Sequence, residues 1–283
     1  MYRAFYQLQK AVNHKNIAVG DLFYATGFKE ARARLDYMKD KGGFVLVSGL
    51  SGVGKTTLLR SFVESLDAKF FKIAYAPLAT VSVCDFYRQL AYLLCGQTLY
   101  KKDLLFRTIQ QTIMEMAVNK KTIPIIIFDD AHFFRNENFF ELQLLSNFNF
   151  DSLSPALFIL TAQPHLQERL RRPVFDSFYQ RISIKINLQP LSSQETHEFI
   201  AHVLKNAAGS SPHTLHTSST STSTSISRNE HLFTPQASEL IFKRSGGIPR
   251  LIAAIMEQAL IYGSANQLST IDENVIYNIE PEL

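Results

Sequence analysis

The chain has 283 residues, 46% of them apolar and 19% charged, and a formal net charge of +4. These values are typical of a soluble globular protein with one large core, or with one core and a smaller satellite domain. No window approaches the ~18 apolar residues that a membrane span needs, and the positive charge permits nucleic-acid binding without demanding it.

The N-terminal ten residues mix charged and amide side chains with aromatic ones, and they lack the apolar core of a signal peptide. The two cysteines, Cys84 and Cys95, fall in one helical pattern. At ~1.5 Å rise per residue they lie roughly 16 Å apart, too far for a disulfide within that helix. A reducing cytosol is the simplest interpretation, so we expect a cytoplasmic protein.

Apolar runs alternate with helical patterns over the first two thirds of the chain. This alternation predicts an α/β fold, a parallel sheet with helices on both faces. The near-continuous apolar runs at 125–128 and 156–160 are typical of strands buried on both sides. The expected strands are 44–48, 69–75, 124–128, 156–161 and 182–188, and the expected helices are roughly 55–66, 84–95, 102–118, 137–147 and 164–180.

A Gly-rich loop follows the first expected strand. Gly49-Leu50-Ser51-Gly52-Val53-Gly54-Lys55-Thr56 satisfies the P-loop pattern and opens a helix that continues with Thr57. Glycines let successive backbone N–H groups point at phosphate oxygens, and the following helix adds its positive dipole end. Lys55 would reach the outer phosphates, and the Thr56 hydroxyl would bind Mg²⁺. The loop therefore predicts a nucleoside triphosphate site, with ATP and Mg²⁺ as the expected ligands.

Residues 125–130, Ile-Ile-Ile-Phe-Asp-Asp, are typical of the acidic strand end that accompanies a P-loop, the Walker B element. Asp129 would hold Mg²⁺ through water, and Asp130 lies where a general base could polarise the attacking water. The weaker alternative is a strand that ends in a solvated acidic turn. A further strand candidate lies between the two motifs, so we expect Asp129 to end a strand that is not the next one in sequence.

After Pro190 the patterns are helical only, which predicts a small helical lid domain. We expect an ATPase domain at 1–190, including its N-terminal lead-in, and the lid at 191–283. The signals that begin or end the lid helices are Ser192 with Glu195, Thr234 with Pro235, Gly246 with Gly247, Pro249, and Asp272.

A tract of small polar residues interrupts the lid. Residues 206–227 carry no Asp, Glu, Lys or Arg, and residues 217–225 are entirely Ser and Thr. Such a tract cannot bury enough apolar area to offset its ordering entropy. We expect a disordered insertion at about 206–230, with a phosphorylated or partner-binding segment as the less favoured alternative.

With these motifs in order, the chain resembles the AAA+ ATPases of the ExeA/GspA and TnsC/TniB group over nearly all its length. The resemblance rests on the P-loop, on Asp129-Asp130-Ala131-His132, and on shorter matches before and after them. These shorter matches are 23–31, 144–148, 160–164, 170–173, 180–183, 188–191 and 245–250.

The resemblance implies a P-loop three-layer αβα sheet with a small C-terminal all-helical lid. It also implies a homo-oligomer, ring or filament, whose ATP sites lie between subunits. The aromatic lead-in at 23–31 would cradle adenine.

The resemblance further assigns roles to single residues. Thr161 or Gln163 would be the sensor that reads the γ-phosphate. Arg181 resembles the arginine finger that reaches a neighbouring subunit's ATP, with Arg171 and Arg172 as competitors and a surface ion pair as the alternative. In the lid, Arg250 resembles the sensor arginine that contacts phosphates within its own subunit, or else packs on acidic neighbours at a helix start. A planar cation suits charge that develops on phosphoryl oxygens.

One position departs from the family pattern, which usually has Glu where this chain has Asp130. Asp is a methylene shorter, so its carboxylate would lie about 1.5 Å further from the attacking water, and errors of about 1 Å can cost ~10²-fold in rate. The departure predicts slow hydrolysis.

Three functions fit these residues. The first is an accessory ATPase of DNA transposition that assembles on duplex DNA and regulates a transposase, with no membrane span of its own. The second is an assembly ATPase of a type II-like secretion system, and the third is an oligomeric signalling switch that does not bind DNA. DNA contact would be through phosphates. The candidate residues for it are Lys101, Lys102, Lys120, Lys121, Arg169, Arg171 and Arg172.

Overall fold

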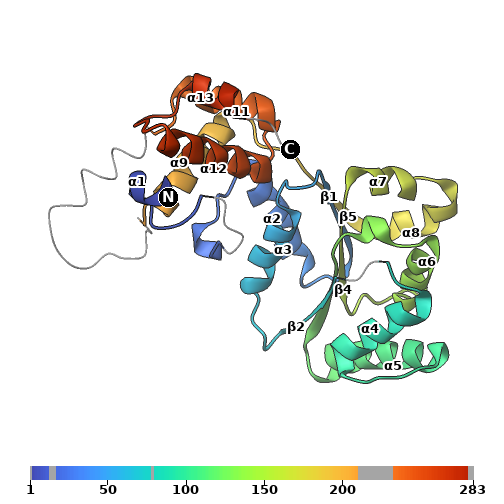
Figure 1. Cartoon of the computed structure of the whole chain (residues 1–283). Helices are drawn as coiled ribbons and strands as arrows, with labels where there is room; N and C mark the ends of the chain where they lie inside the picture. The colour runs from blue at the N-terminus through green and yellow to red at the C-terminus, as the bar shows by residue number, and fades with distance from the viewer. Residues whose placement is uncertain (1, 13–16, 78–79, 210–231, 280–283) are drawn as a thin grey trace. The chain divides into compact units, whose positions relative to one another are not determined.

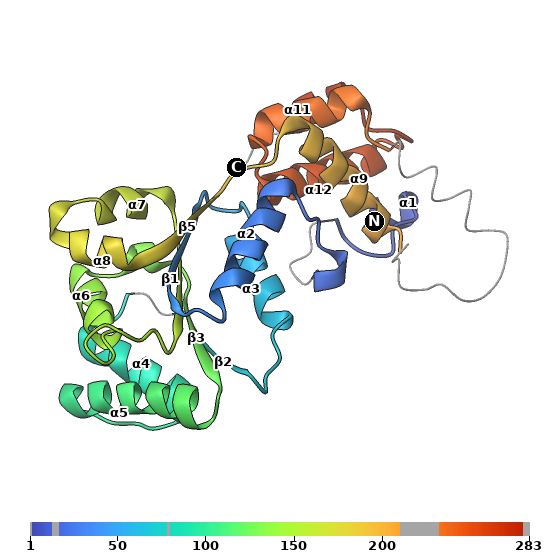
Figure 2. The same cartoon turned by 180° about the vertical axis from the view of Figure 1, so that it is seen from behind.

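The computed structural model describes residues 2–12, 17–77, 80–209 and 232–279. The chain folds into two compact units. Unit 1 comprises Met1–Ala25, Gly52–Gly54 and Gln189–Leu283, and unit 2 comprises Thr26–Ser51 and Lys55–Leu188. Unit 2 contains the sheet and unit 1 is helical (Figures 1 and 2).

A five-stranded sheet forms the centre of unit 2, and every neighbouring pair of strands is parallel. Its order is β2-β3-β4-β1-β5, so β4 lies between the strand that leads to the P-loop and the strand that leads to Asp129. This confirms the expectation that Asp129 ends a strand other than the next one. The strands are β1 (Gly43–Gly49), β2 (Phe71–Ala76), β3 (Ile123–Phe128), β4 (Leu157–Ala162) and β5 (Ile182–Leu188).

Helices cover both faces of this sheet, which confirms the predicted three-layer αβα architecture. Figure 1 shows α2 and α3 on one face and the remaining helices of unit 2 on the other. The helices are α2 (Thr26–Met38), α3 (Lys55–Glu64), α4 (Val83–Cys95), α5 (Lys102–Met114), α6 (Asn136–Leu145), α7 (Pro164–Leu170) and α8 (Asp176–Arg181).

Two helical patterns differ from their predicted course. The pattern at 102–118 ends as α5 and continues as a π-helical turn, η2 (Glu115–Asn119). The pattern at 164–180 divides into α7, a 3₁₀ turn η4 (Pro173–Phe175) and α8. Pro173 has no N–H to donate and biases the residue before it toward extended backbone, and Arg172 has φ −69° and ψ 145°. The prediction of one continuous helix there is wrong for this reason.

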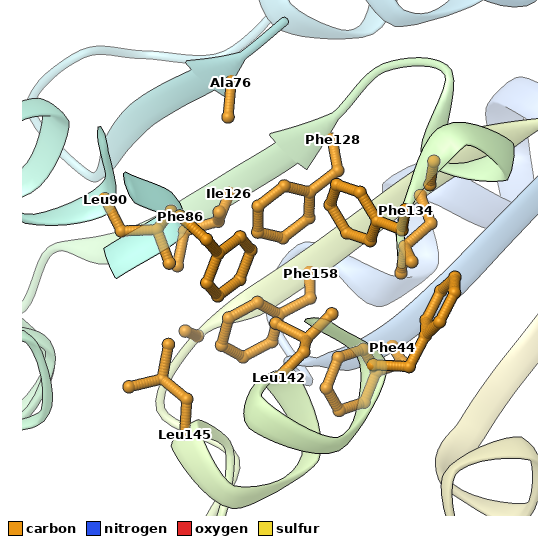
Figure 3. Close-up of a cluster of buried hydrophobic side chains, with 14 of the residues drawn as sticks. Phe44, Ala76, Phe86, Leu90, Ile126, Phe128, Phe134, Leu142, Leu145 and Phe158 are labelled. Atoms are coloured by element: carbon orange, nitrogen blue, oxygen red, sulfur yellow. The ribbon is translucent and has the colours of Figure 1, made fainter. Parts of the chain in front are cut away.

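The larger core of unit 2 lies between the sheet and the helices α4 to α8. Aromatic side chains from adjacent strands point to this face, where Phe44 and Phe158 stack with ring centroids 4.9 Å apart (Figure 3). Phe134, just beyond the Walker B turn, packs against Phe128 at 5.4 Å. Because aromatic pairs of this kind stabilise by more than their buried area alone, the core anchors the turn that carries the acidic residues.

Unit 1 is built from helices whose predicted caps are present. Ser192 Oγ accepts from the Glu195 N–H at 3.2 Å, and the Glu195 carboxylate accepts from the Ser192 N–H at 3.1 Å, so the capping box is confirmed. The second long helix ends at Gly246, which has φ 58°. The helices of unit 1 are α1 (Tyr2–Phe5), the 3₁₀ turn η1 (Val19–Asp21), α9 (Ser193–Ala207), α11 (Pro235–Ser245), α12 (Pro249–Ala265) and α13 (Glu273–Asn278).

The first described residues of the chain, 2–12, pack within unit 1. The Lys10 N–H donates to the Ala207 carbonyl at 3.0 Å, and the Tyr6 hydroxyl donates to the Leu268 carbonyl at 2.9 Å. The sequence pattern assigned this segment to the domain at 1–190, whereas residues 1–25 belong to the helical unit. The predicted insertion at about 206–230 lies almost entirely outside the described residues, and its disorder stays a prediction.

No helix in the described ranges is long and apolar enough to cross a membrane.

Candidate nucleotide site

The carboxyl ends of three neighbouring strands bring the predicted site residues to one edge of the sheet. Val47 in β1 is in register with Thr161 in β4, and Phe128 in β3 is in register with Leu160 in β4. Asp129 therefore follows β3 at the level of Thr161, while β1 runs into the P-loop and α3 begins at Lys55. Ligands of open parallel α/β sheets bind at this edge.

The P-loop backbone has a positive φ, which favours glycine, at both Gly52 (φ +80°) and Gly54. Gly54 has φ +107°, and a Cβ built there would meet no heavy atom within 4 Å. Lys55 is 8% exposed, and its ammonium donates to the carbonyl oxygens of Gly49 and Leu50, both at 2.9 Å. Phosphate oxygens accept stronger, charge-assisted bonds than neutral carbonyls. The lysine is therefore placed inside the loop, where an anion could attract it.

Asp129 is the centre of the hydrogen-bond network at this edge. It is buried, and its Oδ2 accepts from the Thr56 hydroxyl at 3.2 Å and from the Tyr75 hydroxyl at 2.9 Å. Its Oδ1 accepts from the Thr161 hydroxyl and from the Asp130 N–H, the latter at 3.2 Å. Both carboxylate oxygens are thus held by donors. These come from β2, from β4, from the end of β3 and from the first turn of α3.

Asp130 differs from its neighbour in exposure and in backbone conformation. Its φ of 54° and ψ of 40° place it in the left-handed region, which aspartate tolerates better than most residues. The Asp130 N–H donates to the Thr161 hydroxyl at 3.0 Å, so Thr161 bonds to both acidic residues. The Asp130 side chain is 56% exposed, so water can reach its carboxylate. Gln163 lies two residues beyond Thr161, half-buried at the N-cap of α7.

His132 lies in the 3₁₀ turn η3 (Ala131–Phe133), which follows Asp130, and it was not assigned a role from the sequence. It is buried, its Nδ1 lies 3.7 Å from Asp130 Oδ1, and its ring contacts that of Phe133 at a centroid distance of 4.0 Å. Burial lowers the pKa of His132, and the Asp130 carboxylate opposes that shift. The imidazole is therefore mainly neutral at pH 7 beside the exposed carboxylate.

Arg169 holds the same turn from α7. Its guanidinium donates to the carbonyl oxygens of His132 and Phe134, at 3.4 and 2.7 Å, and lies over the ring of Phe139 at 5.3 Å. Burial lowers the pKa of Arg169, with Arg172 adding to the effect. Arg169 is therefore better suited to a structural role than to the predicted contact with DNA phosphates.

The two predicted arginine roles fall in different units. Arg181 ends α8 in unit 2 and forms an ion pair with Asp151. Arg250 is exposed in the first turn of α12 in unit 1, and its N–H donates to the Gly52 carbonyl of the same unit at 3.3 Å. The finger and lid-sensor roles stay predictions.

The chemistry of Thr56 and Asp129 fits Mg²⁺. Both supply oxygen atoms, the donors that this hard cation prefers, and these atoms lie 3.2 Å apart. Within the described ranges, no group of three or more His, Cys, Asp or Glu could hold a metal ion. Mg²⁺ at nucleotide sites uses one or two carboxylates together with substrate phosphates and water, so this sparse donor set is of the expected kind.

Tyr75 is a site residue that the sequence analysis missed. It ends the expected strand 69–75, and its hydroxyl reaches Asp129 from β2. The available signal was a polar aromatic residue at the carboxyl end of a parallel strand, because such ends meet at the ligand-binding edge.

Comparisons with known proteins agree with this geometry. A family model described as an AAA domain matches residues 38–170. General secretion pathway protein A of Aeromonas hydrophila is 32% identical over 248 residues, which are 85% of this chain and 41% of that protein. The chain therefore spans about two fifths of the length of that relative.

Solved structures show the same fold at low sequence identity. A chain of the Drosophila ORC bound to DNA has a TM-score of 0.66 and 14% identity, covering 98% of this chain and 64% of that one. The Aeropyrum pernix ORC2 protein, solved as ADPNP–ADP complexes, has a TM-score of 0.63 and 15% identity over 95% of this chain and 70% of that one. With the sheet order above, these likenesses give the chain an AAA+ P-loop fold.

Proposed function

From this AAA+ fold and its relationship to an ExeA/GspA-type protein, we propose that the chain binds Mg·ATP, hydrolyses it slowly and uses it to control self-assembly. The single observation that supports this most is the Asp129 carboxylate, which accepts hydrogen bonds from Thr56 beside the P-loop lysine and from Thr161 on β4. This is the arrangement that a triphosphate with its cation requires.

The P-loop, Gly49 to Thr57, would bind the phosphates through its N–H groups and Lys55. Thr56 and Asp129 would hold Mg²⁺, which when bound neutralises charge on the phosphate oxygens. Arg250 would add a cation from the lid of the same subunit, and Arg181 one from a neighbouring subunit.

Asp130 would act as the general base that orients and deprotonates the attacking water. Its carboxylate is exposed and its backbone is tied to Thr161, so a short side chain extends from a fixed point. A general base must lie within ~2.6–3.2 Å of the proton it accepts. Thr161, or Gln163, would report the γ-phosphate to this turn, because Thr161 contacts both acidic residues.

The likeness to general secretion pathway protein A, at 32% identity over most of this chain, favours an assembly ATPase of a secretion system. The net charge of +4 favours the second candidate, a DNA-binding helper of transposition. Several of the basic residues predicted to contact DNA have partners within the chain. Lys102 pairs with Glu141, and Lys120 pairs with Glu115 at 2.9 Å. We therefore place the secretion function first.

Sedimentation velocity of the purified chain with ATP, ADP or no nucleotide tests the assembly. Retardation of duplex DNA at low and high salt distinguishes the secretion function from the transposition function. We expect larger species with Mg·ATP than with ADP, and no ATP-dependent DNA retardation. ATP-dependent, salt-sensitive retardation would instead support the transposition function. Sedimentation that ignores nucleotide would contradict the proposed switch.

A further inference from the structure

Tyr75 comes from a strand that carries none of the P-loop or Walker B residues. It lies near the end of β2 and is in register with Ile127 of β3, two residues before Asp129. Its ring is partly exposed, at 42% for the residue, while its hydroxyl donates to Asp129 Oδ2 at 2.9 Å. The bond therefore joins the edge strand of the sheet to the acidic residue of the site.

The Asp129 oxygen that Tyr75 contacts is also the one that Thr56 contacts, at 3.2 Å. The other oxygen, Oδ1, is held by Thr161 and by the Asp130 N–H. Donors on both oxygens restrict rotation of the carboxylate about its last bond. Without the phenol hydroxyl, Thr56 would be the remaining described hydroxyl donor to Oδ2. The same Thr56 hydroxyl is the group proposed to bind the cation.

The Tyr75 phenol is a donor on a side chain separate from the P-loop. Its hydroxyl donates to Asp129 Oδ2 at 2.9 Å. It can therefore hold that oxygen while the Thr56 hydroxyl offers its lone pairs to a cation.

We propose that Tyr75 is a positioning residue for Mg²⁺, which orients the Asp129 carboxylate toward Thr56 and so sets the Mg²⁺ affinity of the nucleotide-bound protein. This inference rests on the proposed function, because it requires Thr56 and Asp129 to hold the cation. Groups that orient metal ligands typically change metal affinity ~10–100-fold when they are mutated.

Tyr75→Phe tests the inference, because it removes only the hydroxyl and keeps the ring. Tyr92→Phe is the matched control, since Tyr92 is an exposed tyrosine of α4 in the same unit. The probe is a fluorescent ATP analogue, whose binding is measured with EDTA and then titrated with MgCl₂. Thermal unfolding of each variant without ligand reports whether the fold is retained.

We expect Tyr75→Phe to raise the half-saturating Mg²⁺ concentration roughly 10-fold, with Mg²⁺-free analogue binding within about twofold of native, as expected for a group that acts only through Asp129. Tyr92→Phe should match the native protein in both measurements. The positioning role would be overturned if Tyr75→Phe had the same half-saturating Mg²⁺ concentration as the native protein, or if it lost equal analogue affinity with and without Mg²⁺. Either result would leave the nucleotide site intact. If the native protein itself binds the analogue without any Mg²⁺ dependence, the proposed cation site fails and the role of Tyr75 fails with it.

Discussion

At the residue scale, the two adjacent acidic residues, Asp129 and Asp130, have different environments. Asp129 is buried under hydroxyl donors, whereas Asp130 is turned by a left-handed backbone and is open to solvent. Thr161 touches both. This division of environment supports the proposed roles, in which Asp129 would hold a cation and Asp130 would meet water.

Asp130→Glu should raise the ATP turnover rate, by about 10-fold. The longer side chain places its carboxylate about 1.5 Å further out, and positioning errors of ~1 Å cost up to ~10²-fold. Steady-state phosphate release under saturating Mg·ATP measures the effect. Asp103→Glu, at an exposed position in the first turn of α5, serves as the control and should leave turnover unchanged. A native enzyme faster than Asp130→Glu would show that the shorter side chain is not what limits the rate.

The P-loop and the Asp129-Asp130 pair could be predicted because their spacing is local and their chemistry demands those residue types. The hydrogen bond from Tyr75 could not be predicted. It joins positions 54 apart in sequence, and it depends on the register of β2 with β3. The clamp of Arg169 on the Phe134 carbonyl likewise follows from packing of α7 that no short motif encodes.

At the scale of elements, the five strands were predictable because runs such as 125–128 are apolar on both faces, which a central parallel strand requires. The break between α7 and α8 was missed although Pro173 was visible, because the apolar spacing continues through it. The packing of the N-terminal segment could not be predicted from local patterns either. The Tyr6 hydroxyl forms a hydrogen bond with the carbonyl of Leu268, 262 positions away. Cap residues were the most reliable element signals.

Ser192→Ala should lower the unfolding free energy of the helical unit by about 1 kcal/mol, because it removes the side-chain acceptor at the N-cap of α9. Chemical denaturation followed by circular dichroism measures the change. Ser192→Thr keeps the hydroxyl and should retain most of the stability. Equal stability of the native and alanine proteins would mean that the capping box contributes nothing measurable.

At the scale of the whole molecule, the fold class followed from the order of motifs, and the sheet order agrees with it. What the chain assembles with is not encoded in the fold, because AAA+ chains of similar architecture serve different machines. The likeness to ORC structures shows architecture alone, and the identity to general secretion pathway protein A extends over only 41% of that protein, so the secretion partner is a proposal.

ATP binding by the P-loop is the claim on which the other proposals depend, and calorimetric titration with Mg·ATP tests it most directly. Lys55→Ala removes the ammonium inside the loop, and Lys243→Ala removes an exposed lysine of α11. We expect the native chain and Lys243→Ala to bind equally, and Lys55→Ala to bind roughly 10–100-fold more weakly, since a hydrogen bond to a charged group is worth ~1.5–3 kcal/mol. Native affinity in Lys55→Ala, or no binding by the native chain, would contradict the nucleotide site.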